Sequence, residues 1–325
     1  MDKGVFKSKR VLVTGATGLI GKCLTIELLK NGAEVFALVR NIEKATAIFK
    51  ENSKLHFIVS DIVDLPLENM KIEYIIHGAS QTGSKDFVYR PVETINTAVL
   101  GTLRILEFAR LNPIKGFIYL SSMEVYGTPY SDNKINELYE TNINTMKVRS
   151  CYPEGKRMCE SICSSYASEY EIPTKVVRLT QTFGPGVQYN DGRVFAEFAR
   201  CVIENKDIVL KTKGETKRNY LYTEDAVSAI LMVLIKGKVS EAYNIANEKT
   251  YCSIHEMAEL VAQKCAKGKI KVVIDEEQEI EKLGYAPTLH MNLDCSKIKK
   301  LGWNPKVDLE EMFNSMIEEL RTQIK

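Results

Sequence analysis

One stretch near the start of this chain decides its fold: RVLVTGATGLIG, residues 10–21. The apolar residues Val11 to Val13 are typical of a short buried strand, and glycines follow at positions 15, 18 and 21. Apolar residues then recur at helical spacing from Leu19 to Leu28. A strand, a glycine turn and a helix in this order indicate a βαβ unit that binds a dinucleotide. The spacing GxxGxxG is a variant of the usual GxGxxG.

The three glycines have different roles in this interpretation. Gly15 allows the tight turn, Gly18 lets backbone N–H groups approach a pyrophosphate, and Gly21 lets the helix pack closely on the strand. The pyrophosphate would lie at the positive end of the helix dipole. The residues expected to contact the cofactor here are Gly15, Thr17, Gly18, Leu19 and Ile20. A strand-to-helix turn without a ligand is the alternative, and the flanking strand and helix favour nucleotide binding.

The second strand of the unit, Glu34 to Val39, is followed by Arg40 rather than by a carboxylate. NAD sites usually have an acidic residue there, which binds the ribose 2′-hydroxyl. A guanidinium would instead attract a 2′-phosphate, and Lys44 is a candidate second cation. Arg40 could also stack on the adenine or lie in solvent. The sequence therefore favours NADP and leaves NAD as the alternative.

The composition is that of an ordinary globular protein. Of the 325 residues, 45% are hydrophobic and 26% are charged, and the net charge of +2 gives no basis for binding nucleic acid or a membrane surface. No stretch approaches the roughly 20 apolar residues of a membrane span, and the first residues lack a signal peptide's apolar run. The 8 cysteines are scattered without CxxC pairs, and the 4 histidines are dispersed. We therefore expect a cytoplasmic protein with reduced thiols and no metal site.

Strand and helix patterns alternate through the first half, which predicts an α/β fold with a doubly wound parallel (Rossmann) sheet. Further strands are expected at 55–59, 74–77, 116–120 and 175–179, with helices at 88–111 and 153–170. We expect residues 1–183 to form the dinucleotide-binding domain and 184–325 a smaller α/β lobe that binds the substrate. Residues 218–236 could return to the main sheet as a strand and a helix. The polar stretch 127–150 is expected to form a loop over the site.

A candidate reaction centre follows the strand at 116–120, which leads into SSMEVYG at residues 121–127. Further along, Tyr152 and Lys156 are four residues apart and share one face of a predicted helix. A tyrosine acts as a base only if its pKa falls far below about 10, and an adjacent ammonium and an oxidised nicotinamide would lower it. Lys156 could also bind the nicotinamide ribose, and Ser122 could bind the substrate hydroxyl. A surface Tyr–Lys pair without function is the alternative.

With these motifs the chain resembles the extended short-chain dehydrogenase/reductase family, in its NAD-dependent epimerase/dehydratase branch that acts on nucleotide sugars. The resemblance extends over nearly the whole chain, through the segments YIIHGAS, SSMEVYG, YPEGK, RLTQTFGPG and LGWNP. It implies a catalytic triad of Ser122, Tyr152 and Lys156. It also implies that Asp61 and Ile62 lie beside the adenine and that Ala79 contacts the cofactor. The substrate is expected to contact Ser80, Ser122, Gln181 and Arg218. In this family the helices at 88–111 and 153–170 pair into a four-helix bundle, which predicts a homodimer.

The leading hypothesis is a nucleotide-sugar epimerase, dehydratase or decarboxylase that works through a transient 4-keto sugar, with NADP or NAD as cofactor. Glu124 is a candidate base for the second stage, and a purely structural role is the alternative. Met123 stands where dehydratases often have a proton donor, which weakens dehydration. The first alternative function is an NADP-dependent ketoreductase of a nucleotide-linked keto sugar. The second is a non-catalytic nucleotide-sensing regulator, against which the intact triad argues.

Overall fold

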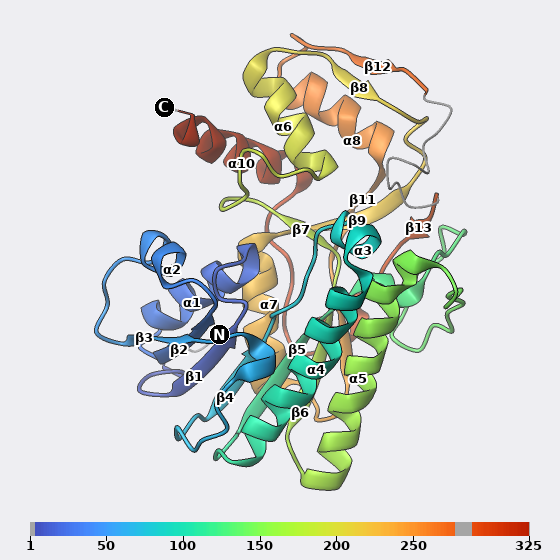
Figure 1. Cartoon of the computed structure of the whole chain (residues 1–325). Coiled ribbons are helices and arrows are strands. Elements are labelled where there is room, and N and C mark those ends of the chain that lie inside the picture. Colours follow the sequence, from blue (N-terminus) through green and yellow to red (C-terminus); the bar gives the residue numbers. More distant parts are fainter. Residues whose placement is uncertain (1–3, 277–287, 325) are drawn as a thin grey trace.

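A parallel sheet forms the centre of the molecule and confirms the expected doubly wound α/β fold (Figure 1). The computed structural model describes residues 4–276 and 288–324. Seven strands lie in the order β10-β6-β5-β4-β1-β2-β3, so the strand order reverses between β1 and β4. The strands are β1 (Arg10–Thr14), β2 (Glu34–Val39), β3 (Leu55–Val59), β4 (Tyr74–His77), β5 (Gly116–Ser122), β6 (Thr174–Leu179) and β10 (Ala242–Ile245). Ligands bind at such a reversal, beyond the carboxyl ends of the strands.

Helices cover both faces of this sheet, because successive strand residues point to opposite sides. Val11 and Val13 pack in a core with α1 and α7, whereas Leu12 packs in a second core with α4 and α5. Figure 1 shows α4 and α5 side by side along one face. The helices of the main body are α1 (Leu19–Lys30), α2 (Ile42–Ile48), α3 (Asp86–Tyr89), α4 (Pro91–Arg110), α5 (Cys151–Tyr170) and α7 (Thr223–Lys236). Short turns of 3₁₀-helix are η1 (Ile62–Asp64), η2 (Met123–Tyr126) and η3 (Val148–Ser150).

The helix expected at 88–111 is interrupted, and the prediction of one continuous helix there is wrong. Pro91 occupies the first turn of α4, and Arg90 before it has φ −136°, outside the helical range. A proline fits the first turn of a helix and restricts the residue before it, so the chain forms the separate short helix α3. The loop after β4 thereby gains a rigid turn that carries Phe87 toward α5.

A smaller second body is built around a four-stranded sheet with the order β11-β9-β13, in which β7 also pairs with β9. Phe183, Phe195 and Phe313 pack against one another in its core. Its strands are β7 (Gln181–Phe183), β8 (Ile208–Leu210), β9 (Lys217–Tyr222), β11 (Asn247–Ser253), β12 (Val272–Ile274) and β13 (His290–Met291). Its helices are α6 (Val194–Glu204), α8 (Ile254–Leu260), the π-helical turn η4 (Val261–Cys265) and α10 (Leu309–Gln323), whereas α9 (Ser296–Lys299) packs on β10 of the main sheet. Figure 1 shows α6, α8 and α10 gathered above the main sheet.

Residues 218–236 were expected to return to the main sheet as a strand and a helix. The helix does so, and the strand does not. Helix α7 packs on β5 and β6 of the main sheet. The strand β9 instead pairs with β7 and β11 in the smaller sheet, because β10 occupies the place beside β6. The chain therefore crosses between the two bodies more than once. Residues 127–147 form an irregular stretch, in which Ile135 makes an isolated β-bridge to Leu293. Within the described residues, no helix is long and apolar enough to cross a membrane.

Candidate active site

The turn between β1 and α1 has the geometry that its glycines predict. Gly15 has φ +70°, and a Cβ there would lie 2.8 Å from the carbonyl of Gly78 at the end of β4. A Cβ on Gly21 would overlap the carbonyl oxygen of Gly15, so the helix can pack here only without a side chain. Gly18 is the N-cap of α1 and cannot cap it with a side chain. The first N–H groups of the helix are therefore available to an anion.

Thr14 joins the ends of β1 and β4 at the point where the strand order reverses. Its Oγ1 accepts the N–H groups of Gly78 and Ala79, each at 3.1 Å, and lies 2.7 Å from His77 Nδ1. His77 is fully buried, and its Nε2 lies 3.1 Å from Thr102 Oγ1 on α4. Burial, with a smaller contribution from the charge of Lys156, lowers the pKa of His77 to about 3. This neutral imidazole is a structural bridge behind the site.

Arg40, Asp61 and Ile62 meet at the ends of β2 and β3, on the other side of the glycine turn. Arg40 Nη1 lies 4.0 Å from Asp61 Oδ2, and the Arg40 side chain is 76% exposed. Asp61 caps the η1 turn by accepting the N–H of Val63 at 3.2 Å. Ile62 is buried against Gly101, where an added Cβ would lie 2.9 Å from it. A free helix end, a glycine turn and an apolar ledge beside polar groups fit a dinucleotide at this edge of the sheet.

Ser122 and Tyr152 come together at the end of β5. Ser122 ends the strand, its Oγ accepts the Glu124 N–H at 3.2 Å, and it also hydrogen-bonds Tyr152 in the first turn of α5. Phe87 stacks on the Tyr152 ring, with centroids 4.2 Å apart and 15° between planes. Burial, followed by the charge of Glu124, raises the pKa of Tyr152, and the Ser122 hydrogen bond partly offsets this. Tyr152 is thus a neutral phenol in this structure.

Lys156 lies one helical turn beyond Tyr152 and is buried. Its Nζ donates to the carbonyl oxygen of Leu120 at 2.8 Å and lies 5.8 Å from the centre of the Tyr152 ring. Burial lowers the pKa of Lys156 to about 8. Lys156 is not among the groups that shift the pKa of Tyr152 here, and its Nζ is directed at the Leu120 carbonyl. The phenol's pKa is set by burial instead.

Glu124 is held in an ion pair that the sequence did not reveal. Arg149 Nη1 donates to Glu124 Oε2 at 2.9 Å, and Nη2 donates to Oε1 at 3.4 Å. The Arg149 guanidinium also lies 5.6 Å from the centre of the Phe87 ring. Glu124 lies in the short η2 turn and Arg149 in the short η3 turn. Neither residue is therefore part of a helical or strand periodicity that could have indicated the pair. The position of Arg149, three residues before Tyr152 in RSCYPEGK, was the one clue in the sequence.

Met123 faces away from the site and belongs to the core. Its side chain is 5% exposed, and its sulfur lies 3.4 Å from Thr180 Oγ1. The same hydroxyl donates to the carbonyl of Asn219 at 2.5 Å, which ties η2 to β9. This position therefore offers neither an acid nor access to the space beside Tyr152.

Of the residues expected to contact the substrate, two pair with each other in the smaller sheet. Arg218 Nη1 donates to Gln181 Oε1 at 3.1 Å, because β7 and β9 are neighbours in the smaller sheet. Ser80, in the loop after β4, donates to the carbonyl of Gln81 at 3.3 Å.

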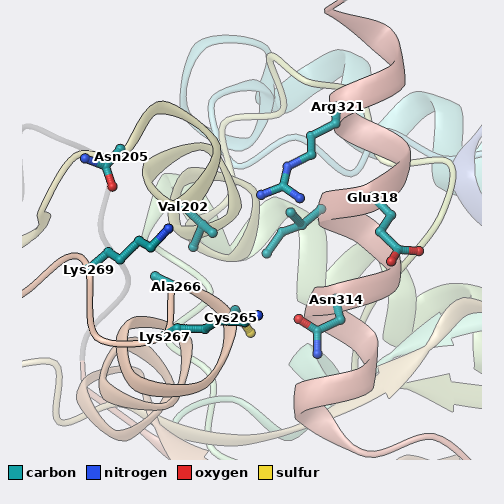
Figure 2. Close-up of a pocket in the computed structure, with 10 residues that line it drawn as sticks. Val202, Asn205, Cys265, Ala266, Lys267, Lys269, Asn314, Glu318 and Arg321 are labelled. Carbon is teal, nitrogen blue, oxygen red and sulfur yellow. The ribbon is translucent and has the colours of Figure 1, made fainter.

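Figure 2 shows a separate cavity of about 550 Å³, lined by residues of α6, η4 and α10 such as Val202, Cys265 and Arg321. None of its lining residues belongs to the candidate active site.

Comparison with known proteins gives the family of this chain. The NAD dependent epimerase/dehydratase family matches residues 11–246. The UDP-glucuronic acid decarboxylase 1 of Xenopus tropicalis is 32% identical over 325 residues, which cover 98% of this chain and 73% of that protein. The UDP-glucuronic acid decarboxylase 6 of Arabidopsis thaliana is 31% identical over 325 residues, covering 97% of this chain and 90% of that protein.

Solved structures share the fold. The UDP-glucose 4-epimerase of Thermotoga maritima, determined with UDP-glucose, has a TM-score of 0.83 at 24% identity and covers 97% of this chain and 100% of its own. The dTDP-glucose 4,6-dehydratase of Bacillus anthracis, determined with NAD, has a TM-score of 0.78 at 21% identity and covers 97% of each chain. The glycine turn, the parallel sheet and these matches agree, and the chain belongs to the NAD-dependent epimerase/dehydratase family.

Proposed function

We propose that this protein oxidises carbon 4 of a nucleotide-linked sugar and that its net reaction is a decarboxylation. The observation that carries the proposal is the meeting of Ser122 and Tyr152 at the carboxyl end of β5, beside the glycine turn, with Lys156 buried one turn below. The substrate's nucleotide would bind at the smaller sheet, where Arg218 of β9 pairs with Gln181 of β7.

Tyr152 and Ser122 have complementary tasks in this proposal. Ser122 holds the hydroxyl at carbon 4, and Tyr152 takes its proton as a general base. A bound oxidised nicotinamide supplies the hydride acceptor and a positive charge. Because burial raises the pKa of Tyr152 in the free protein, the phenol needs added positive charge before it can act as a base. Lys156, already poorly solvated, is placed to turn from the Leu120 carbonyl toward the cofactor ribose.

Decarboxylation fits the site better than dehydration does. Dehydration needs an acid for the leaving hydroxyl and a base for the neighbouring carbon, but Met123 is buried and Glu124 is paired with Arg149. A ketone at carbon 4 of a hexuronic acid makes a β-keto acid, which loses carbon dioxide without a dedicated base. The curated relatives described above are named as UDP-glucuronic acid decarboxylases, which supports the same choice.

The cofactor is proposed to be NADP in preference to NAD. The support is Arg40, whose exposed guanidinium lies at the end of β2 with only a 4.0 Å approach to Asp61. A cation in this position attracts a 2′-phosphate. In the alternative function, a ketoreductase, NADPH would deliver its hydride to a keto sugar and leave as NADP, so the reduced cofactor would be consumed and not retained.

We further propose a homodimer formed through α4 and α5. Apolar side chains on these helices stay exposed in the monomer, including Val92 at 66%, Leu100 at 48% and Met158 at 53%. Pairing with a second copy would bury them in a four-helix bundle. Light scattering at micromolar concentration should give twice the monomer mass, and a monomer would contradict the bundle. A cytoplasmic location is also proposed, since all eight cysteines are free of disulfides.

The experiment that tests the function combines two measurements on purified protein. Mass spectrometry would identify any cofactor carried through purification, and UDP-, dTDP-, GDP- and CDP-sugars, including UDP-glucuronate, would then be screened for conversion. The expected result is carbon dioxide release from a nucleotide-linked uronic acid without net consumption of cofactor. Stoichiometric consumption of NADPH with a keto sugar would establish the ketoreductase instead. Binding of nucleotides without turnover of any sugar would favour a regulator.

A further inference from the structure

A cation that the proposed chemistry has not used lies beside Tyr152. Arg149 belongs to the η3 turn that leads directly into α5. Its guanidinium pairs with Glu124 on one side and lies 5.6 Å from the centre of the Phe87 ring on another. Since Phe87 stacks on Tyr152 at 4.2 Å, one aromatic ring separates the positive charge from the phenol.

The ion pair leaves part of this guanidinium without a partner. A guanidinium has five N–H donors, and only the two Nη atoms of Arg149 face Glu124, one of them at 3.4 Å. Nε is buried and has no acceptor in the part of the chain that the structure describes. Nε itself is out of reach of a ligand, so the donors open to an arriving anion are the Nη N–H groups that do not face Glu124. The side chain is still 29% exposed and therefore accessible.

The local charges favour one chemical class of substrate. Glu124 alone would repel a second carboxylate near Tyr152, but Arg149 neutralises it and can be shared between two acceptors. In a hexuronic acid the carboxyl carbon is separated from carbon 4 by only one ring carbon, so a sugar whose 4-hydroxyl contacts Tyr152 places its carboxylate close to this ion pair. A neutral hexose has a hydroxymethyl group at that point.

We propose that Arg149 determines specificity by binding the carboxylate of a nucleotide-linked hexuronic acid, with Glu124 as an internal competitor for the guanidinium. This rests on the proposed function, because the argument places the 4-hydroxyl on Tyr152. The carboxylate of a uronate would replace Glu124 as the partner of Arg149, whereas a neutral sugar would leave the Arg149–Glu124 ion pair in place. The ion pair would thereby favour a charged sugar over a neutral one.

The test compares two nucleotide sugars in a protein that cannot turn them over. In a Tyr152→Phe background saturated with NADP, and in parallel with NAD, calorimetry would measure the Kd of UDP-glucuronate and of UDP-glucose. Arg149→Gln should raise the Kd of UDP-glucuronate about 10- to 100-fold, the range expected for a lost charge-assisted hydrogen bond, and leave UDP-glucose unchanged. Arg149→Lys, which keeps the charge, should recover part of the loss.

A second variant should act in the opposite direction. Glu124→Gln removes the competing carboxylate, so UDP-glucuronate should bind several-fold more tightly while UDP-glucose stays the same. Arg157→Gln is the matched control, since Arg157 lies on α5, pairs only weakly with Glu154 at 4.0 Å and should change neither Kd.

Each outcome decides between the two levels of the proposal. Equal losses for both sugars in Arg149→Gln, or weaker UDP-glucuronate binding in Glu124→Gln, would overturn the role of Arg149 and leave the proposed function standing. If neither sugar binds to the folded Tyr152→Phe protein or to the wild type, the proposed function would be overturned, and the role of Arg149 with it.

Discussion

The glycine turn and the surroundings of Tyr152 lie on the same edge of one sheet, but different kinds of contact hold them. At the turn the constraint is backbone against backbone: Gly21 on Gly15, and Gly15 on Gly78. Around Tyr152 it is side chain against side chain, with Phe87 and Arg149 brought in by separate segments. An added Cβ at Gly15 or Gly21 should therefore disrupt the turn. Around Tyr152, removal of a single functional group should abolish the activity.

The largest expected effect tests the side-chain half of this comparison. Tyr152→Phe removes one hydroxyl and keeps the ring that Phe87 stacks on, so the fold and cofactor binding should persist. Turnover should fall by about 10²- to 10⁴-fold, as expected for loss of a general base. Steady-state kinetics on a confirmed substrate measures this, and Tyr170→Phe at the far end of α5 is the control. Activity near that of wild type would remove Tyr152 from the mechanism.

The next effect tests the backbone half. Gly21→Ala places a Cβ into the Gly15 carbonyl, so α1 must move away from β1. Overpacking of this kind destabilises by about 1–3 kcal/mol, and the moved helix end should also weaken cofactor binding. Denaturant unfolding and calorimetry would measure the two losses. Gly192→Ala, where an added Cβ meets nothing within 4 Å, should show neither.

The same distinction explains what the sequence could predict. The strand pattern of Val11 and Val13 and the three glycines act over a few residues, so the turn followed from them, and the alternation of such local patterns predicted the parallel sheet. The Arg149–Glu124 pair and the Phe87 stack join residues far apart in the chain, and no local pattern encodes them. The expected return of a strand from residues 218–236 to the main sheet was wrong for the same reason, because the whole sheet decides which strand lies at its edge, and β10 takes the place beside β6.

Not every wrong prediction arose from contacts between distant residues. Pro91 stands in the sequence as a helix-start signal, and the helix predicted at 88–111 should have been divided there. The inward orientation of Met123 could not be predicted in the same way, because it depends on Thr180 from a distant strand end.

His77 supports the glycine turn from behind, since it bridges Thr14 at the end of β1 and Thr102 on α4. Its pKa is lowered from 6.5 to about 3, so between these values the unfolded chain binds a proton that the folded protein does not. Stability should therefore fall as the pH drops through this window, by up to about 1.4 kcal/mol per pH unit. Denaturant unfolding of wild type and His77→Gln from pH 7 to pH 4 should show a shallower loss in the variant. If the wild type and His77→Gln lose the same stability between pH 7 and pH 4, protonation of His77 does not contribute to the pH dependence.

The smallest expected effect refines the cofactor side, where one exposed side chain rather than the backbone decides between two ligands. Arg40→Ala removes a guanidinium that is 76% exposed, so solvent screens much of its attraction for a 2′-phosphate. We expect NADP to bind about ten-fold more weakly and NAD to change little, since only NADP has the 2′-phosphate. Calorimetric titration with both cofactors measures this, and Arg110→Ala at the far end of α4 is a control of the same charge. Equal losses for the two cofactors would mean that Arg40 stacks on the adenine, which both share. An unchanged pair of affinities would mean that Arg40 serves only Asp61, and the preference for NADP would then lose its support.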